Sequence, residues 1–303
     1  MSKLQAWLHA SRLRTLPLAF SSIITGSAIA YKHAPQHFNY TVLILCFITT
    51  LLLQILSNLA NDYGDSQKGT DNSERIGPTR AIQSGALSFN EMKRGIIICT
   101  SLALLSGIWL IIEATKGMHF GVGFAFLLLG LSSIAAAIKY TVGKNAYGYL
   151  GLGDVFVIFF FGWVGVAGSY YLQAKYFSAI VLLPATTIGF LAATVLHLNN
   201  MRDRENDQNS NKITLAVRLG FDNAKPYFYW LNIIALFSLG LFFLWSKLYW
   251  WQFAIAVLPF AILGTTCFKV HQIKQAQDFD PLLKVNALST FLLSLLFALA
   301  LIL

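Results

Sequence analysis

Residues 40–60 read YTVLILCFITTLLLQILSNLA, an uninterrupted run of 21 positions without a charged side chain. A helix needs about 20 predominantly apolar residues to cross the hydrocarbon core of a bilayer. Directly after this run the chain becomes polar and acidic, with NDYGDSQ at residues 61–67. The stretch therefore predicts a membrane-spanning helix that ends in a group of carboxylates.

The composition of the whole chain supports a membrane protein. Apolar residues make up 56% of the 303 positions and charged residues only 12%, whereas soluble domains carry about 25% charged residues. This balance excludes a soluble enzyme. The net charge of +9 does not indicate nucleic acid as a partner, because the cations lie in short segments between apolar runs, as in proteins embedded in a lipid bilayer.

Nine apolar segments are long enough to cross a membrane. They are residues 15–31, 40–60, 95–115, 120–138, 150–173, 177–198, 228–246, 250–269 and 284–303. Every backbone polar group in a bilayer must be paired within the protein, which leaves helices or closed barrels. No repeated ten-residue alternation of a barrel occurs, so the sequence predicts an all-α, polytopic membrane protein with nine transmembrane helices.

The basic residues predict how these helices are oriented. With the N-terminus inside, the outer segments hold only Lys32, Lys116, Lys175 and Lys247, so 18 of the 22 lysines and arginines lie inside. This bias predicts a cytoplasmic N-terminus and a C-terminus on the opposite side. The two longest connections, residues 61–94 and 199–227, then face the cytoplasm. We expect a central cavity open toward this face, with the two connections as lid loops. No cleavable signal or transit leader is apparent, which favours a bacterial inner (plasma) membrane.

Two acidic motifs follow the second and sixth predicted spans. Each holds one asparagine and two aspartates, spaced i, i+4, i+7 in the first and i, i+4, i+8 in the second, so each set shares one face if the helix continues. Asn58 and Asn199 lie 141 positions apart, as do Asp62 and Asp203, which suggests a weak internal repeat. The residues are Asn58, Asp62 and Asp65 in the first motif, and Asn199, Asp203 and Asp207 in the second.

Carboxylates that converge on one cavity repel one another unless a cation lies between them. Oxygen ligands without histidine or cysteine favour Mg²⁺, which shares its coordination with substrate phosphates. Arginine and lysine side chains, which bind phosphate, follow both motifs closely. These candidate phosphate contacts are Lys68, Arg75, Arg80, Arg202 and Lys212. The alternative is that the acidic residues are only helix caps or a solvated loop, but matching spacing at matching helix ends favours a functional site.

These motifs resemble the UbiA-type intramembrane prenyltransferases. The resemblance extends along the chain and covers every cytoplasmic feature, so we expect one membrane-embedded domain over residues 1–303. The stretches that carry it are residues 13–20, 58–85 (acidic motif 1), 148–154, 199–220 (acidic motif 2) and 279–284. In the superfamily pattern N-D-x-x-D-x-x-x-D the last position is Gly69 here and the next carboxylate is Asp71, which leaves the role of Asp71 open.

The resemblance implies Mg²⁺-dependent transfer of a polyprenyl chain from polyprenyl diphosphate to an aromatic acceptor. It is strongest for the branch that prenylates 1,4-dihydroxy-2-naphthoate in menaquinone synthesis, in which the acceptor also loses CO₂ and demethylmenaquinol forms. The family pattern makes Asp62, Asp65, Asp203 and Asp207 the metal ligands and catalytic carboxylates. Further substrate contacts are expected from Asn58, Asn199, Lys68, Arg75, Arg80 and Lys212.

Other residues are predicted to serve the same reaction from the cytoplasmic membrane face. Asp154, in the fifth predicted span, is costly to bury and is a candidate proton acceptor, or alternatively a cap or the partner of an arginine. Arg14 is a candidate contact for the carboxylate of the acceptor, or a positive-inside anchor. His197 is expected to be a packing histidine. Aromatic faces stabilise passing carbocations, and the candidates for this role are Tyr63, Tyr140 and Tyr149.

Two other functions compete with this interpretation. A 4-hydroxybenzoate-type polyprenyltransferase of ubiquinone synthesis would use the same chemistry on another acceptor. A secondary transporter would also combine many spans with buried charge, but its site would lie near the bilayer midplane. Here the acidic residues follow the ends of the predicted helices, which favours an enzyme.

Overall fold

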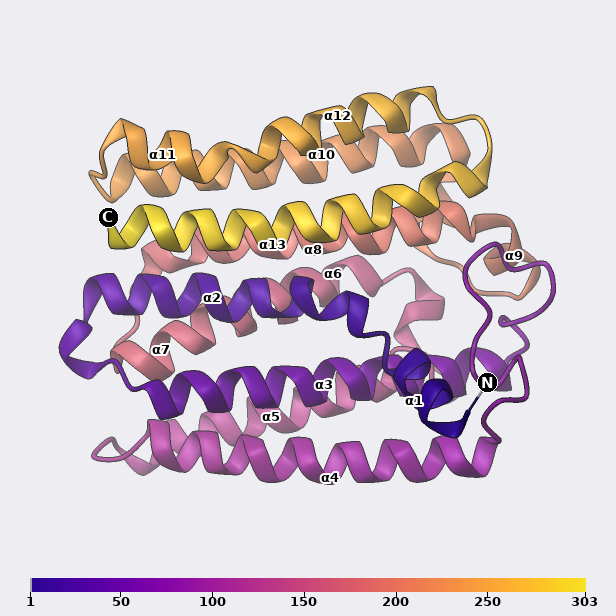
Figure 1. Ribbon diagram of the computed structural model, residues 1–303, viewed down its shortest axis with the longest axis horizontal. Coiled ribbons are helices and arrows are strands. Elements are labelled where there is room, and N and C mark those ends of the chain that lie inside the picture. Colours follow the sequence, from indigo (N-terminus) through magenta and orange to yellow (C-terminus); the bar gives the residue numbers. More distant parts are fainter. Residues whose placement is uncertain (1) are drawn as a thin grey trace.

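The structure, a computed structural model, describes residues 2–303, and the prediction of an all-α chain is confirmed. No strand occurs within these residues, and the long helices lie side by side along one direction (Figure 1). These long helices are α2 (Leu16–His33), α3 (Tyr40–Gln67), α4 (Phe89–Ala114), α5 (Phe120–Lys139), α8 (Leu182–Arg202), α10 (Leu215–Trp245) and α13 (Asp280–Ile302).

Three of the spans include more than one helical piece. The first joins α1 (Lys3–Ser11) to α2, and another joins α6 (Gly153–Val157), a π-helical turn at Ile158–Ala167 and α7 (Gly168–Ala174). The third is α11 (Trp250–Val257) with α12 (Pro259–Gln272), which are bent by 41°. Eight helices within residues 2–303 are long and apolar enough to cross a membrane, and the bent pair makes nine. The predicted number of spans agrees with this count.

The polar elements gather at one end of the bundle, which we call the motif end. It holds α1, the connection 68–88 and the short helix α9 (Arg204–Asn209), and the N-terminal part of the chain begins there (Figure 1). The C-terminus lies at the opposite end (Figure 1), as expected for an odd number of spans.

Helix α8 lies at the centre of the fold because its neighbours cover it on several sides. It packs against α10, α13 and the π-helical turn. Ile188 and Leu191 of α8 are fully buried in the largest core cluster with Tyr170, Phe242 and Phe297. Burial on this scale fixes where α8 ends, and therefore where the second acidic motif emerges.

The first acidic motif is carried by an unbroken helix. Helix α3 continues to Gln67, so Asp62 and Asp65 share one helical face, as the spacing predicts. A Cβ atom at Gly64 would lie 2.6 Å from the hydroxyl of Thr141, so glycine permits this close approach. The segment after α5 is thereby packed directly against the acidic end of α3.

The second acidic motif differs from the predicted continuous helix and long loop. Helix α8 ends at Arg202, Asp203 forms the junction, and α9 follows at once. Helix α10 already begins at Leu215, so only residues 210–214 separate it from α9. Within α10, Gly220 has φ 75° and ψ 173°, a kink that favours glycine because a side chain would be strained there.

Candidate functional site

The carboxylates of α3 are buried and face basic partners from other elements. Asp62 is 1% exposed and pairs with Arg12, and the Nε of Arg80 lies 3.6 Å from its Oδ1. Asp65 accepts a hydrogen bond of 2.8 Å from the hydroxyl of Tyr149, and Lys212 Nζ lies 3.6 Å from its Oδ2. The carboxylates at the end of α3 thus form an acidic surface, and they are paired with cations from three other parts of the chain.

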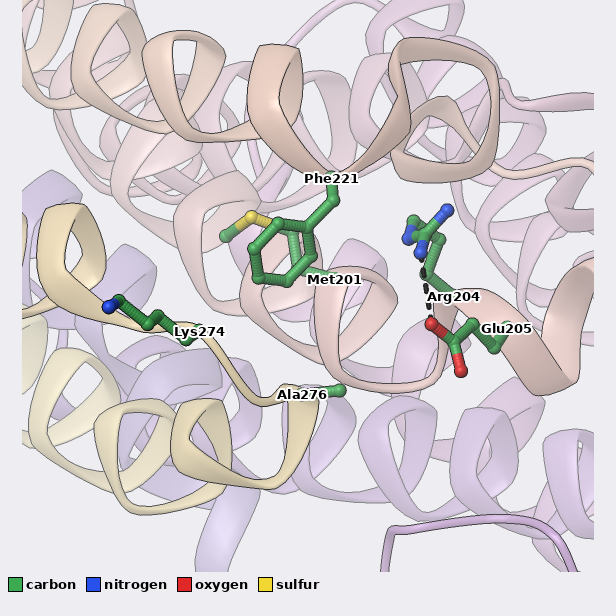
Figure 2. Close-up of a pocket in the computed structure, with 6 residues that line it drawn as sticks. All are labelled: Met201, Arg204, Glu205, Phe221, Lys274 and Ala276. Carbon is green, nitrogen blue, oxygen red and sulfur yellow. Dashed lines mark hydrogen bonds and ion pairs between the residues drawn. The ribbon is translucent and has the colours of Figure 1, made fainter.

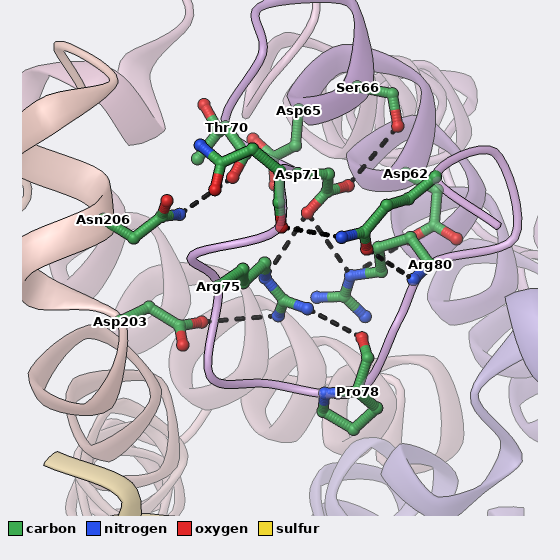
Figure 3. Close-up of polar contacts among 12 residues, drawn as sticks. Asp62, Asp65, Ser66, Thr70, Asp71, Arg75, Pro78, Arg80, Asp203 and Asn206 are labelled. Atoms are coloured by element: carbon green, nitrogen blue, oxygen red, sulfur yellow. Dashed lines mark hydrogen bonds and ion pairs between the residues drawn. The ribbon is translucent and has the colours of Figure 1, made fainter.

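The connection 68–88 folds over this surface and brings its own charges. Asp71 lies between Arg75 and Arg80, whose Nε atoms are 3.3 and 3.7 Å from its Oδ1 (Figure 3). Burial raises the pKa of Asp71 to about 6 and lowers the pKa of Arg80 to about 9. Arg75 also reaches Asp203 at 3.3 Å, so the connection joins the two acidic motifs.

Asp203 is held by arginine at both of its carboxylate oxygens. Arg202 donates to Oδ1 at 2.9 Å through Nε and to Oδ2 at 2.7 Å through Nη2. Arg202 also pairs with Asp280 and donates to the side-chain oxygen of Asn199 at 2.8 Å. Burial opposes ionisation of Asp203, but the hydrogen bonds from Arg202 outweigh it and hold its pKa below the usual value. Asp203 is therefore ionised and tightly positioned.

The buried carboxylate of Asp207 has fewer basic partners than that of Asp203. It is 2% exposed on α9, its only cation among the described residues is Lys212 at 3.6 Å, and its Oδ2 has no hydrogen-bond partner there. Burial raises the pKa of Asp207 to about 7. Burial also disfavours the charged form of Lys212, but Asp207 and Asp65 outweigh this and raise the pKa of that amine above its usual value. A buried carboxylate of this kind is stabilised by an additional cation.

Aromatic side chains line one side of the acidic surface. The Tyr149 hydroxyl also lies 2.6 Å from the hydroxyl of Thr70, and the Nζ of Lys68 lies 3.7 Å from the centre of the Tyr149 ring. Burial and nearby carboxylates keep the pKa of Tyr140 above its usual value, so its phenol stays protonated. Tyr63 instead packs on Phe89, with ring centres 5.6 Å apart, outside this group.

The remaining predicted residues occupy different places. Asn58 is buried and donates to the Ser11 carbonyl oxygen at 3.0 Å, which ties α3 to the junction of α1 and α2. Arg14 is exposed and forms no ion pair with the residues that the structure describes. Arg12, two positions earlier, is the arginine that reaches Asp62.

Asp154 lies in the first turn of α6, close to a histidine. It is 2% exposed, and its Oδ2 is 3.6 Å from the Nδ1 of His197 on α8. A Cβ atom at Gly153 would touch the Tyr140 ring, with its hydroxyl 3.3 Å away. Tyr140 therefore lies beside the start of α6, which carries Asp154.

Several contributors to the site were not predicted from the sequence. Arg12 and Asp280 provide ion pairs, and the Asn206 side chain donates to the Thr70 carbonyl at 2.8 Å, fastening α9 to the connection 68–88 (Figure 3). Asp280 belongs to the short stretch 279–284 that supported the family resemblance, so a signal for it was present. Arg12 gave no signal beyond its charge.

No group of three or more acidic, histidine or cysteine side chains within residues 2–303 is arranged as a metal site. The arginines and Lys212 explain this arrangement, because they occupy the space between the carboxylates. Several buried carboxylate oxygens nevertheless lack a hydrogen-bond partner among the described residues: Asp62 Oδ2, Asp71 Oδ1 and Asp207 Oδ2. Orphaned anionic oxygens from both motifs are the donor type that Mg²⁺ prefers.

Two hollows flank the acidic surface. A polar pocket of about 450 Å³ is lined by Lys68, Asn72, Asn209 and Asn211, between the connection 68–88 and the start of α10. A smaller pocket of about 140 Å³ lies on the other side of α9, where Phe221 and Met201 point into the space beside the Arg204–Glu205 ion pair (Figure 2). The larger pocket adjoins Lys68, one of the candidate phosphate contacts.

The fold and the paired acidic motifs define a class of protein, and comparison with known sequences identifies it. The model of the UbiA prenyltransferase family matches residues 19–295. This chain therefore belongs to the UbiA prenyltransferase family.

Two relatives show which members of the family this chain is similar to. The chain is 44% identical over 300 residues to 1,4-dihydroxy-2-naphthoate octaprenyltransferase of Haemophilus influenzae, which covers 99% of this chain and 96% of that protein. It is 50% identical over 258 residues to the protein of the same name from Escherichia coli, covering 84% and 82% of the two chains.

Solved structures share the fold. One, described as digeranylgeranylglyceryl phosphate synthase, aligns with a TM-score of 0.63 at 15% identity and covers 100% of this chain and 99% of that one. A UbiA homolog from Archaeoglobus fulgidus bound to DMAPP and Mg²⁺ aligns with a TM-score of 0.59 at 15% identity, covering 96% and 99%. At this identity the likeness concerns the fold alone.

Proposed function

We propose that this chain transfers a polyprenyl group from polyprenyl diphosphate to 1,4-dihydroxy-2-naphthoate, with release of diphosphate and CO₂, to give demethylmenaquinol. The observation that carries the proposal is the meeting of two acidic motifs and their basic partners at one end of a membrane bundle. This chain is 44% and 50% identical to two octaprenyltransferases named for this acceptor, over 96% and 82% of their lengths. These identities support the choice of substrate.

The donor set at the motif end fits Mg²⁺. We assign Asp62, Asp65, Asp203 and Asp207 as the residues that would hold it, since oxygens of both Asp62 and Asp207 are buried without a hydrogen-bond partner among the described residues. Bound there, Mg²⁺ would neutralise charge that develops on the leaving diphosphate.

The basic residues of the site are suited to hold the diphosphate. Arg75 and Arg80 are planar donors that can pair with phosphate oxygens in the bidentate manner typical of arginine, and Lys68 and Lys212 add point charges. These cations now pair with carboxylates or lie over an aromatic ring. Binding of the diphosphate would therefore exchange one set of anionic partners for another, without leaving a buried cation unpaired.

The aromatic side of the site is suited to the other half of the reaction. Loss of diphosphate leaves an allylic cation, which water would quench and which aromatic faces stabilise by about 0.5–2 kcal/mol each. Tyr149 donates to Asp65 of the acidic surface, and Tyr140 lies beside Gly153, the residue before Asp154. Asp154, at 2% exposure, is assigned as the group that accepts a proton from the ring hydroxyl of the acceptor.

The orientation of the chain belongs to the same proposal. The motif end faces the cytoplasm, where charged substrates are available, and the C-terminus lies on the other side. The distribution of basic residues supports this orientation, and a bacterial inner membrane is the proposed location.

The direct test uses membranes that contain this chain, supplied with Mg²⁺, a polyprenyl diphosphate and 1,4-dihydroxy-2-naphthoate. Mass spectrometry is expected to detect the prenylated, decarboxylated naphthoquinol and its oxidised quinone. Parallel membranes receive 4-hydroxybenzoate. Product from 4-hydroxybenzoate alone would contradict the proposed acceptor, and absence of product and of released diphosphate with every tail length would contradict the proposed enzyme.

A further inference from the structure

His197 is completely buried, and one of its ring nitrogens has a defined protonation state. The Nε2 atom lies 2.9 Å from the carbonyl oxygen of Ala224 on α10. A carbonyl oxygen only accepts hydrogen bonds, so Nε2 must carry a hydrogen and donate it. In the neutral ring the other nitrogen, Nδ1, therefore carries a lone pair.

The only ionisable group that faces Nδ1 at ion-pair distance within the described residues is Asp154. Its Oδ2 lies 3.6 Å away, and neither this oxygen nor Nδ1 has a hydrogen-bond partner there. Without a proton between them, two lone pairs would face each other in a site from which water is excluded. One proton shared by the two groups removes this repulsion and leaves the pair without net charge, the least costly state in a membrane interior.

Other groups enclose the pair. The Tyr227 ring packs against that of His197 with centres 4.7 Å apart. The Tyr140 ring, just after α5, lies beside Gly153, the residue before Asp154. The groups around the pair from the end of α5, α8 and α10 are thus phenols, the imidazole and a carbonyl, with no arginine or lysine in an ion pair with Asp154 among the described residues. His197 is the basic partner of Asp154.

We propose that His197 is a positioning residue for prenyl transfer, and that it shares one proton with Asp154 and enables this carboxyl group to take a second proton from the acceptor. This inference rests on the proposed function, in which Asp154 receives the hydroxyl proton. It assigns to His197 a role that its sequence position does not reveal.

The O–H bond of the ring hydroxyl breaks, its proton moves to the carboxyl group of Asp154, and the electron pair remains on the ring oxygen. At the same time the shared proton moves fully to Nδ1, so an imidazolium offsets the new negative charge. The C1–O bond of the prenyl diphosphate breaks, and its electrons leave with diphosphate. The electron-rich ring carbon that carries the carboxylate then bonds to C1 of the allylic cation. Loss of CO₂ returns electrons to the ring, and the ring oxygen regains its proton from the pair.

The test compares variants at two positions where a side chain of α8 donates to a backbone carbonyl of α10. His197→Gln keeps an N–H group for Ala224 but cannot take up a proton. Thr187→Val is the matched control, because the Thr187 hydroxyl donates to the Ala235 carbonyl at 3.0 Å and contacts no ionisable group. His197→Gln is expected to lower kcat by about 10²-fold with little change in either KM, and to move the acidic limb of the pH profile of kcat. Thr187→Val should leave the profile in place.

A second measurement addresses the shared proton without relying on turnover. Infrared difference spectra of the wild-type protein should contain a carboxyl stretching band that disappears in Asp154→Asn and shifts in His197→Gln. Unchanged kcat and pH profile in His197→Gln, while the wild type makes product, would overturn the role of His197 and leave the proposed function intact. A band that is the same in the wild type and in His197→Gln would overturn the claim that the two groups share a proton. This conclusion holds even if the wild type makes no product and the proposed function is wrong.

Discussion

The guanidinium of Arg75 lies 3.3 Å from the carboxylate of Asp203, although 128 positions separate the two residues in the sequence. The same guanidinium lies 3.3 Å from Asp71. Arg75 thus joins the connection that follows α3 to the junction of α8 and α9. Since its side chain is only 5% exposed, solvent screens these ion pairs weakly.

Replacement of Arg75 tests whether this contact matters for the substrate. Arg75→Gln should lower kcat/KM for the polyprenyl diphosphate by about 10- to 100-fold, because hydrogen bonds to charged groups contribute ~1.5–3 kcal/mol. Arg204→Gln is the control, because the one ion pair that Arg204 forms within residues 2–303 is with its neighbour Glu205, at 3.1 Å. Steady-state kinetics that show equal losses in the two variants would contradict the role of Arg75.

The structure and the sequence assign substrate contact to different arginines near the N-terminus: the structure favours Arg12 and the sequence favours Arg14. Arg12 contacts buried Asp62 and Arg14 is exposed, so Arg12→Gln should raise KM for the diphosphate substrate about tenfold or more and Arg14→Gln much less. The measurement is KM for both substrates in membranes with matched amounts of protein. A larger effect of Arg14→Gln, confined to the KM of the acceptor, would instead support the contact with the acceptor carboxylate that the sequence suggested.

The close packing at Gly64 leads to a prediction about stability. A Cβ atom at this position would lie within 2.7 Å of three atoms of Thr141, so Gly64→Ala should destabilise the protein by ~1–3 kcal/mol through overpacking. Gly130→Ala is the control, because nothing lies within 4 Å of a Cβ there and alanine favours the helix by up to about 1 kcal/mol. Thermal unfolding in detergent measures both, and equal midpoints would contradict the close approach.

Membrane orientation has its own test. A reporter fused after Leu303 should give a signal from the non-cytoplasmic side, and one inserted in the connection 115–119 should do the same. A reporter in the connection 68–88 should read as cytoplasmic. Any other combination would overturn either the orientation or the number of spans.

The large features of the fold follow from hydropathy and helical spacing. Nine apolar runs predict the spans, and the i, i+4, i+7 spacing places Asp62 and Asp65 on one face because α3 continues through them. The same geometry explains Tyr63: adjacent residues on a helix point about 100° apart, so a neighbour of Asp62 leaves the acidic face and packs on Phe89.

Other features depend on tertiary contacts that spacing does not encode. Helix α10 begins at Leu215 rather than 228, since its first turns carry charged residues and hydropathy detects only the apolar part. Arg12 reaches Asp62 because α1 ends there in a left-handed conformation, φ 48°. The proximity of His197 to Asp154 depends on how α6 and α8 pack, which no local pattern reveals.

The central claim is that carboxylates of both acidic motifs jointly bind Mg²⁺ and a prenyl diphosphate. The most direct measurement is equilibrium binding of an unreactive prenyl thiolodiphosphate to the purified chain, with and without Mg²⁺. Asp62→Asn and Asp207→Asn provide one variant from each motif, and Glu113→Gln is the control, because Glu113 lies at the far end of α4.

We predict that Mg²⁺ increases the affinity of the wild type and of Glu113→Gln by at least ~10-fold, because the ion offsets repulsion between the carboxylates and the diphosphate. Each aspartate variant should lose this increase while remaining inserted in the membrane. Full Mg²⁺-dependent binding by either aspartate variant would contradict the claim that the two motifs form one site.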